Sequence, residues 1–147
     1  MNDERDLAAR TFPEAGESLA RNAVALLPIG ATEPHGPHLP LETDVIISVE
    51  TARRAASRQA RGGIETLVLP AIPYSITDFS AGFPGALSIP RATSLALLTG
   101  ISTAAIAGGF RAVCFVNSHL EPDHLMVLRE AAAAASAATG RPVIFPD

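Results

Sequence analysis

The chain has 147 residues, of which 48% are hydrophobic and 18% are charged. These proportions exclude an intrinsically disordered chain and predict a single domain, residues 1–147, with enough length to bury a core. The net charge of −4 and the pI near 5.5 provide no basic surface for nucleic acid, so no nucleic acid is expected as a partner.

From the sequence we expect neither a secreted protein nor one that is inserted into a membrane. Residues 1–6 are mostly charged and lack the apolar core of a signal peptide, which predicts a cytoplasmic protein. Residues 92–110 form an uncharged stretch of 19 residues, but eight of them are Ser, Thr or Gly, which is too polar for a good membrane span. We predict instead a helix that is largely buried inside a globular protein, with no membrane partner.

Short apolar runs alternate with longer helical segments along the chain. Thr43 or Asp44 is expected to cap the first of the predicted helices, and residues 70–90 are expected to be irregular. Because the apolar runs are continuous rather than alternating, we predict a mainly parallel sheet covered on both faces, which is a three-layer α/β/α domain. The predicted strands are 23–29, 64–69, 112–116 and 142–145, and the predicted helices are 44–61, 91–107 and 122–138.

The four histidines of the chain fall in two loops, and each loop directly follows a predicted strand. His35 and His38 lie in the loop after the first strand, whereas His119 and His124 follow the third. Ligands of parallel sheets bind outside the carboxyl ends of the strands, so both loops are expected at the ligand-binding edge.

Carboxylates accompany the histidines in both loops, with Glu33 and Asp44 in the first and Glu121 in the second. A set of Glu, His and Asp without thiolates suits Zn²⁺ or Mn²⁺. The set could also hold two ions, in which case Asp44 would bridge them and each ion would gain one Glu and one His. A water between two such ions becomes a hydroxide nucleophile near neutral pH. The alternative is that both loops are charged segments that merely face solvent.

The first loop also carries a long motif. The run PIGATEPHGPHLPLETD resembles the signature of the creatininase (creatinine amidohydrolase) family, which is close to P-x-G-(S/A)-x-E-x-H-G-x-H-L-P-L-x-T-D. The segment GFRAVCFVNSHLEPDHL resembles the second metal motif of that family, and the run GFPG at 82–85 resembles its FPG element. The resemblance extends from about residue 23 to the C-terminus and implies a creatininase-like α/β/α fold.

Carried over position by position, the resemblance implies five ligands for two divalent ions, Zn and/or Mn. Glu33, Asp44 and His119 would hold one ion. His35, Asp44 and Glu121 would hold the other. Asp44 would therefore bridge the ions, which agrees with the two-ion arrangement that the residues themselves allow.

The other two histidines remain outside this ligand set. His38 belongs to the signature and is expected either to orient a ligand carboxylate or simply to pack. His124 is expected at the surface. The segment 75–80 lacks the histidine that many relatives carry there, so the substrate contacts are expected to differ.

The resemblance implies a metal-dependent amidohydrolase that hydrolyses a cyclic amide or a related small C–N bond of a small-molecule substrate. The motifs assign neither a general acid nor a substrate-binding residue. The chain ends at Asp147, whereas family members continue well beyond this point, so we expect the domain to be incomplete at its C-terminus. The alternative is a truncated member that binds metal and assembles without turnover. Family membership also implies a homo-oligomer.

Overall fold

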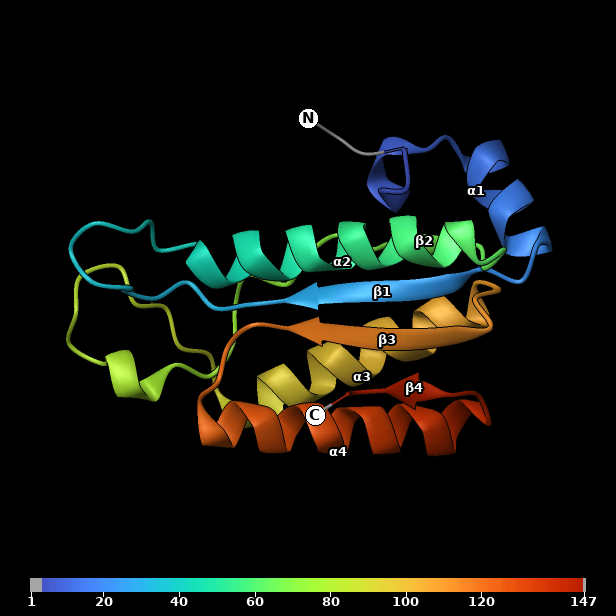
Figure 1. Ribbon diagram of the computed structural model, residues 1–147. Coiled ribbons are helices and arrows are strands. Elements are labelled where there is room, and N and C mark those ends of the chain that lie inside the picture. The colour runs from blue at the N-terminus through green and yellow to red at the C-terminus, as the bar shows by residue number, and fades with distance from the viewer. Residues whose placement is uncertain (1–3, 147) are drawn as a thin grey trace.

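Four parallel strands form the central sheet of the computed structural model, which describes residues 4–146 (Figure 1). The two central strands pair along their full lengths, from Val24 opposite Ala112 to Ile29 opposite Asn117. The strand order is β2-β1-β3-β4, with bounds β1 (Val24–Ile29), β2 (Thr66–Val68), β3 (Ala112–Asn117) and β4 (Val143–Ile144).

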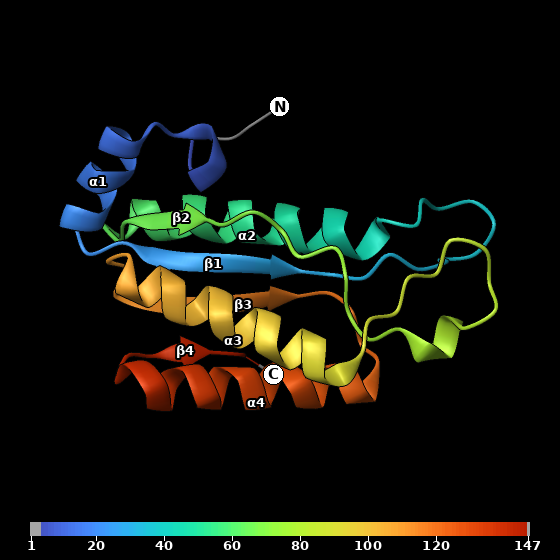
Figure 2. The same cartoon turned by 180° about the vertical axis from the view of Figure 1, so that it is seen from behind.

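Helices cover both faces of this sheet (Figures 1 and 2). α2 (Thr43–Arg61) packs on one face, against β1, β2 and β3. α3 (Arg91–Ala107) and α4 (Pro122–Thr139) pack against each other on the opposite face. The predicted three-layer α/β/α architecture with a parallel sheet is therefore confirmed.

Each face of the sheet has its own apolar core, because successive side chains of a strand point to opposite faces. Leu26 of β1 packs with Ala52 and Ala56 of α2. Its neighbours Ala25 and Leu27 belong to the larger core beneath α3 and α4. That larger core also contains Ile29, Leu98, Phe110, Val113, Phe115, Val127, Leu128 and Ala131.

The N-terminal region contains two elements that the sequence analysis did not assign, the 3-10 turn η1 (Leu7–Ala9) and the helix α1 (Phe12–Ala20). α1 begins with a capping box, in which Thr11 and Glu14 exchange hydrogen bonds, and it has a proline in its first turn. These local signals are present in the sequence. They were missed because the helix is short and buries only Ser18 completely.

Two predicted details of the helices are wrong. Glu42 is the N-cap of α2 and makes no side-chain capping bond, so neither Thr43 nor Asp44 caps the helix; both lie in its first turn. α3 is buried along one narrow stripe only, formed by Ser94, Leu98 and Ser102, because its main packing partner is α4. Among residues 4–146, no helix has the length and apolar character needed to cross a bilayer.

The order of the strands places a crevice between β1 and β3. The chain leaves β1 and crosses through α2 to β2 on one side, and then passes through α3 to β3 on the other side. At such a reversal of strand order, the loops after the two strands diverge to opposite faces and leave room for a ligand. The loops after Ile29 and Asn117 both begin at this crevice.

Gly30 brings the end of β1 into contact with the start of α2. A Cβ atom added at Gly30 would lie 2.6 Å from the backbone nitrogen of Val45 and 2.9 Å from Cβ of Asp44. The missing side chain therefore allows the first turn of α2 to approach the strand directly.

We expect Gly30→Ala to lower the free energy of unfolding by about 1–3 kcal/mol, because the clash is with backbone that cannot move aside cheaply. Gly100→Ala in α3 is the matched control, since a Cβ there meets nothing within 4 Å. The control should be neutral or stabilising by up to ~1 kcal/mol, as alanine favours helix over glycine. Urea unfolding measures both, and equal stabilities of the two variants would contradict the close approach.

Candidate metal centre

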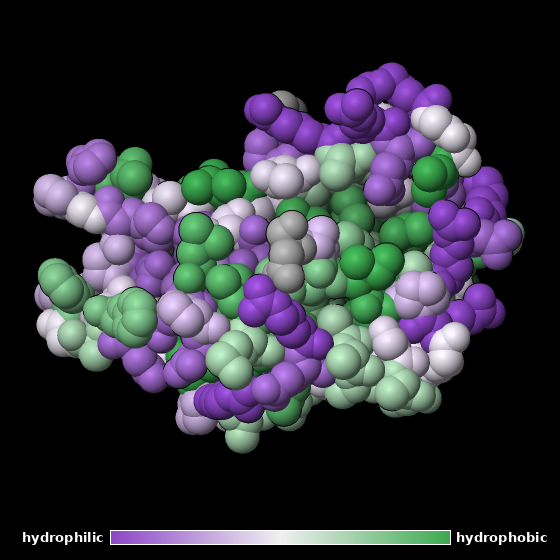
Figure 3. Space-filling view, turned by 60° about the horizontal axis from the view of Figure 1, so that its bottom comes forward, coloured by the Kyte–Doolittle hydropathy of each residue, from purple (hydrophilic) through white to green (hydrophobic). Residues whose placement is uncertain are grey.

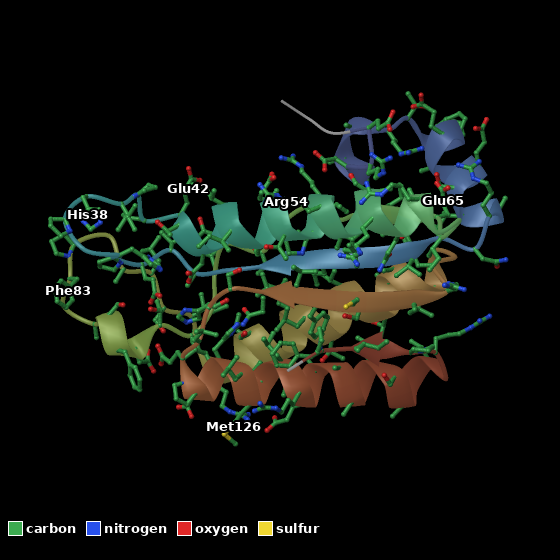
Figure 4. The ribbon with its side chains drawn as sticks, in the orientation of Figure 1. His38, Glu42, Arg54, Glu65, Phe83 and Met126 are labelled. Carbon is green, nitrogen blue, oxygen red and sulfur yellow. The ribbon has the colours of Figure 1, made fainter. Side chains whose placement is uncertain are left out.

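Polar side chains from three segments gather at the carboxyl edge of the sheet. The first segment is the loop 30–42 after β1, the second is the short loop 118–121 after β3, and the third is the segment 73–90 that contains the 3-10 turn η2 (Asp78–Ser80). Figure 4 shows His38 and Phe83 at the outer ends of the first and third segments, beyond the sheet. The candidate metal ligands lie further inward, close to the strand ends.

Asp44 lies at the centre of this group and is only 3% exposed. It belongs to the first turn of α2, beside Gly30. The free backbone N–H groups of a helix N-terminus favour a negative charge there. The two carboxylate oxygens of Asp44 face different histidines, His35 and His119.

His35 has both ring nitrogens in contact with oxygen atoms. Its Nδ1 lies 3.2 Å from the backbone carbonyl of Glu33, and its Nε2 lies 2.9 Å from Oδ1 of Asp44. Both oxygens only accept hydrogen bonds, so a neutral ring can donate to one of them. With a cation beside Nε2, the proton lies on Nδ1 and is donated to the Glu33 carbonyl. In the neutral ring, Nε2 therefore presents its lone pair to the Asp44 carboxylate.

His119 repeats this arrangement from the other side of the crevice. Its Nε2 lies 2.6 Å from the backbone carbonyl of Ile76 and must donate the proton. Its Nδ1 lies 3.1 Å from Oε1 of Glu33 and 3.2 Å from Oδ2 of Asp44. The lone pair of a second neutral imidazole therefore faces two carboxylates.

These contacts need a positive charge between the rings and the carboxylates. Oδ2 of Asp44 is buried and has no hydrogen-bond partner among the described residues. A buried carboxylate without a partner is costly, whereas a cation would be bound by the facing lone pairs. Glu33, His35 and Asp44 offer ligand atoms that all lie within 4.8 Å of one another. The residues present therefore fit a divalent metal ion.

The pKa of His119 reports the same negative field. Burial by itself lowers this pKa, but the close carboxylate of Asp44, the bond to the Ile76 carbonyl and the charge of Glu33 outweigh burial and raise it. A proton on Nδ1 is thus stabilised in the place where a metal ion would bind.

The segment 73–90 holds the two glutamates. Oε2 of Glu33 accepts hydrogen bonds from the hydroxyls of Thr77 and Ser80, the latter at 3.0 Å. The carboxylate of Glu121 accepts from the backbone N–H groups of Asp78 and Phe79 at 3.1 and 3.3 Å. Each glutamate is oriented by these bonds and keeps lone pairs for a cation.

Two pockets open beside these ligands. One has a volume of about 240 Å³ and is lined by Glu33, His119 and Glu121 together with Ser80, Phe79 and Leu120. Phe79 and Leu120 are 79% and 75% exposed. The other pocket, of about 470 Å³, is lined by Pro34, Gly36, Pro37, Ser80 and Phe83. Apolar surface therefore lies directly next to the charged cluster.

The remaining two histidines differ from expectation. His38 is exposed and lies at the outer end of its loop, so it does not pack in the interior (Figure 4). His124 was expected at the surface but is completely buried. The correction follows from the direction of α4: His124 shares the inward stripe of that helix with Val127, Leu128 and Ala131.

Sequence reasoning gave Glu33, His35, Asp44, His119 and Glu121 as candidate ligands. The structure brings together Glu33, His35 and Asp44 and places Nδ1 of His119 against Glu33 and Asp44. Glu121 lines one pocket together with Glu33 and His119. It adds four supporting side chains that the sequence analysis did not select: Thr77, Ser80, Asn117 and His124. Asn117 had a signal, because it directly follows the third predicted strand and lies inside the second motif.

Known proteins similar to this chain include two curated relatives. A mycofactocin precursor peptide peptidase of Mycolicibacterium smegmatis is 37% identical over 97 residues, which is 65% of this chain and 39% of that protein. A creatinine amidohydrolase of Pseudomonas putida is 31% identical over 113 residues, which is 74% of this chain and 42% of that protein. The chain thus spans about two fifths of the length of these relatives.

Solved structures with the same fold include creatininase in a Mn form and a mutant creatininase of the Zn–Zn type. Their TM-scores are 0.85 and 0.86 at 24% and 23% identity, and each match covers 99% of this chain and 58% of the other. The family profile for creatininase, described as creatinine amidohydrolase, matches residues 8–145. That match spans nearly the whole chain and both histidine loops, and the chain therefore belongs to the creatininase family.

Proposed function

We propose that this chain carries the metal centre of an amidohydrolase that hydrolyses a cyclic amide or a related small C–N bond. The observation that carries the proposal is the pair of imidazoles, His35 and His119, whose outer nitrogens donate to backbone carbonyls while their inner nitrogens face carboxylate oxygens. Ligating histidines are commonly held in this way, with the second nitrogen bonded to a carbonyl.

The proposed cofactors are two divalent ions, Zn and/or Mn. Glu33, Asp44 and His119 would hold one ion, and the contacts of His119 with both carboxylates support this set. His35, Asp44 and Glu121 would hold the other, with Oδ1 of Asp44 already directed at His35. The creatininase structures with the same fold include Mn and Zn–Zn forms, which supports the choice of metals.

The residues of the chain have separate tasks in this proposal. Bound divalent ions would polarise a substrate carbonyl and lower the pKa of a bound water towards 7. Thr77 and Ser80 hold Glu33 in place, and the backbone of η2 holds Glu121, so the ligands are positioned before substrate arrives. Phe79 and Leu120 place apolar surface at the mouth of the site.

A peptide amide is the second candidate substrate. The relative from Mycolicibacterium smegmatis is named as a peptidase of a precursor peptide. The apolar pocket beside Pro34, Pro37 and Phe83 would accommodate a hydrophobic side chain next to the scissile bond. A small cyclic amide such as creatinine has no such side chain to place there.

The first prediction concerns metal content. The purified chain should bind close to two divalent ions, and Asp44→Ala should lose both, because one carboxylate serves both ions. Asp123→Ala is the matched control, since Asp123 is an exposed carboxylate in the first turn of α4 and should keep both ions. Elemental analysis after dialysis measures the stoichiometry. Loss of a single ion from Asp44→Ala would contradict the bridging role.

The second prediction concerns turnover. The chain should bind metal but hydrolyse amides at least about 100-fold more slowly than a full-length relative, since a general acid alone contributes 10²–10⁴-fold and the motifs assign none. The assay compares this chain with a version extended by the remaining part of a relative. Creatinine, other cyclic amides and short peptides with apolar residues form the substrate panel.

Equal rates for the two versions would show that these 147 residues hold the complete catalytic apparatus. Hydrolysis of the peptides alone would favour the second candidate substrate. A metal-loaded chain without turnover on any substrate, in both versions, would favour the alternative of a binding module.

We also propose that the chain forms a homo-oligomer through its open sheet edge. Within residues 4–146, no strand pairs with the outer edge of β4, and Ile144 on that strand is 50% exposed. The view in Figure 3, which brings the side of α4 forward, shows hydrophobic residues exposed in several patches between polar ones. Exposed edges and apolar patches of this kind favour association with a second copy.

Light scattering at micromolar concentration should therefore give a mass above the 15.2 kDa of one chain. Ile144→Lys should shift the chain towards monomer, because a lysine on an edge strand opposes strand pairing. Met126→Lys is the matched control, since Met126 is 51% exposed on the outer side of α4. A clean monomer for the unsubstituted chain would refute the proposal.

A further inference from the structure

A buried hydrogen-bond network lies directly behind His119. The side-chain oxygen of Asn117 accepts from the backbone N–H of His119 at 3.3 Å, and its Nδ2 donates to the backbone carbonyl of His119 at 2.6 Å. Nε2 of His124 lies 2.9 Å from the same Asn117 oxygen. Asn117 is the last residue of β3. It therefore links that strand to the loop that carries His119 and to the first turn of α4.

This network fixes the orientation of every group in it. The backbone of His119 offers one donor and one acceptor, so the amide of Asn117 must present its oxygen to the N–H group and its nitrogen to the carbonyl. Because that amide oxygen only accepts, Nε2 of His124 must carry the proton and donate. Nδ1 of His124 is buried without a hydrogen-bond partner among residues 4–146, so a second proton there would be unsatisfied. His124 is therefore a neutral imidazole with its proton on Nε2.

The surroundings keep His124 neutral. Burial is the main cause that lowers the pKa of His124 to about 3. The two rings are tilted by 47° and their centroids lie 4.9 Å apart, so His124 also packs against the ring of His119.

An ordinary core position would not require a histidine here. The other inward residues of α4 are apolar, at Val127, Leu128, Ala131 and Ala135. A fully buried ring with one unpartnered nitrogen costs stability relative to a well-packed apolar side chain. The polar contact that offsets this cost is the bond to Asn117. Within residues 4–146, the other hydrogen bonds of the Asn117 side chain go to the backbone of His119.

We propose that Asn117 and His124 are positioning residues that hold the His119 loop so that Nδ1 of His119 faces Glu33 and Asp44 and can bind a divalent cation. The pair fixes the backbone of His119, the carbonyl of Ile76 fixes its Nε2, and the ring of His124 supports its face. This inference rests on the proposed metal centre and adds residues outside its ligand set.

The test measures Co²⁺ binding by competition with a chelator, together with the absorption spectrum of the bound Co²⁺. His124→Leu should weaken one Co²⁺ site by roughly 10–100-fold and change its spectrum, because loss of an outer partner of a ligating histidine has effects of this size. His124→Gln should recover most of the affinity, since its amide can donate to Asn117. Met126→Leu, on the outer side of the same helix, should behave as the unsubstituted chain (Figure 4).

Asn117→Asp is the second variant and decides the question if His124→Leu does not fold. It keeps the acceptor for His124 but places a carboxylate oxygen against the carbonyl of His119, so the same site should weaken. Folded His124→Leu or Asn117→Asp protein with unchanged Co²⁺ affinity and spectrum would overturn the inference.

A measurement on metal-free protein separates this inference from the proposed function. In His124→Leu the backbone N–H of His119 should exchange with solvent faster than in the unsubstituted chain, because its acceptor Asn117 is no longer held. An unsubstituted chain that binds no Co²⁺ would refute the proposed function. Unchanged exchange at His119 would overturn the positioning role whether or not the metal binds.

Discussion

The buried carboxylate of Asp44 is the constraint on which the rest of the site depends. Its two oxygens face two imidazole nitrogens from opposite sides of the crevice, and one oxygen has no hydrogen-bond partner among the described residues. Burying such a charge is unfavourable unless positive charge is supplied. The start of α2 provides part of it, through the helix N-terminus, and the absence of a side chain at Gly30 allows that helix start to reach the strand.

The topology of the sheet explains why the two histidine loops meet. β1 and β3 are neighbours in space although about 80 residues separate them along the chain, and their connections leave in opposite directions. The loops then diverge, and the segment 73–90 closes the space between them by bonding to both glutamates. Three segments distant in sequence are therefore joined by hydrogen bonds around the candidate ligands.

Membership of the creatininase family agrees with the site but does not define its substrate. One relative, 37% identical, is named as a peptide peptidase, and another, 31% identical, as a creatinine amidohydrolase. The ligand residues are those that the family signature implies, whereas the surface around them is apolar and includes the exposed Phe79, Phe83 and Leu120. Under the proposed function, bond cleavage and the choice of substrate would therefore be carried by different residues.

The sequence by itself determined the α/β class and the main helices, because hydrophobic periodicity is a local property. The five candidate ligands followed from the family resemblance of two motifs, each of which is contiguous in the sequence. Only the tertiary structure decided which nitrogen of each histidine faces the carboxylates, since the backbone carbonyls that fix the rings, such as that of Ile76, come from distant segments. The same reason explains the error at His124. The exposure of His124 depends on which face of α4 packs towards the sheet. The sequence of a single helical turn does not specify that face.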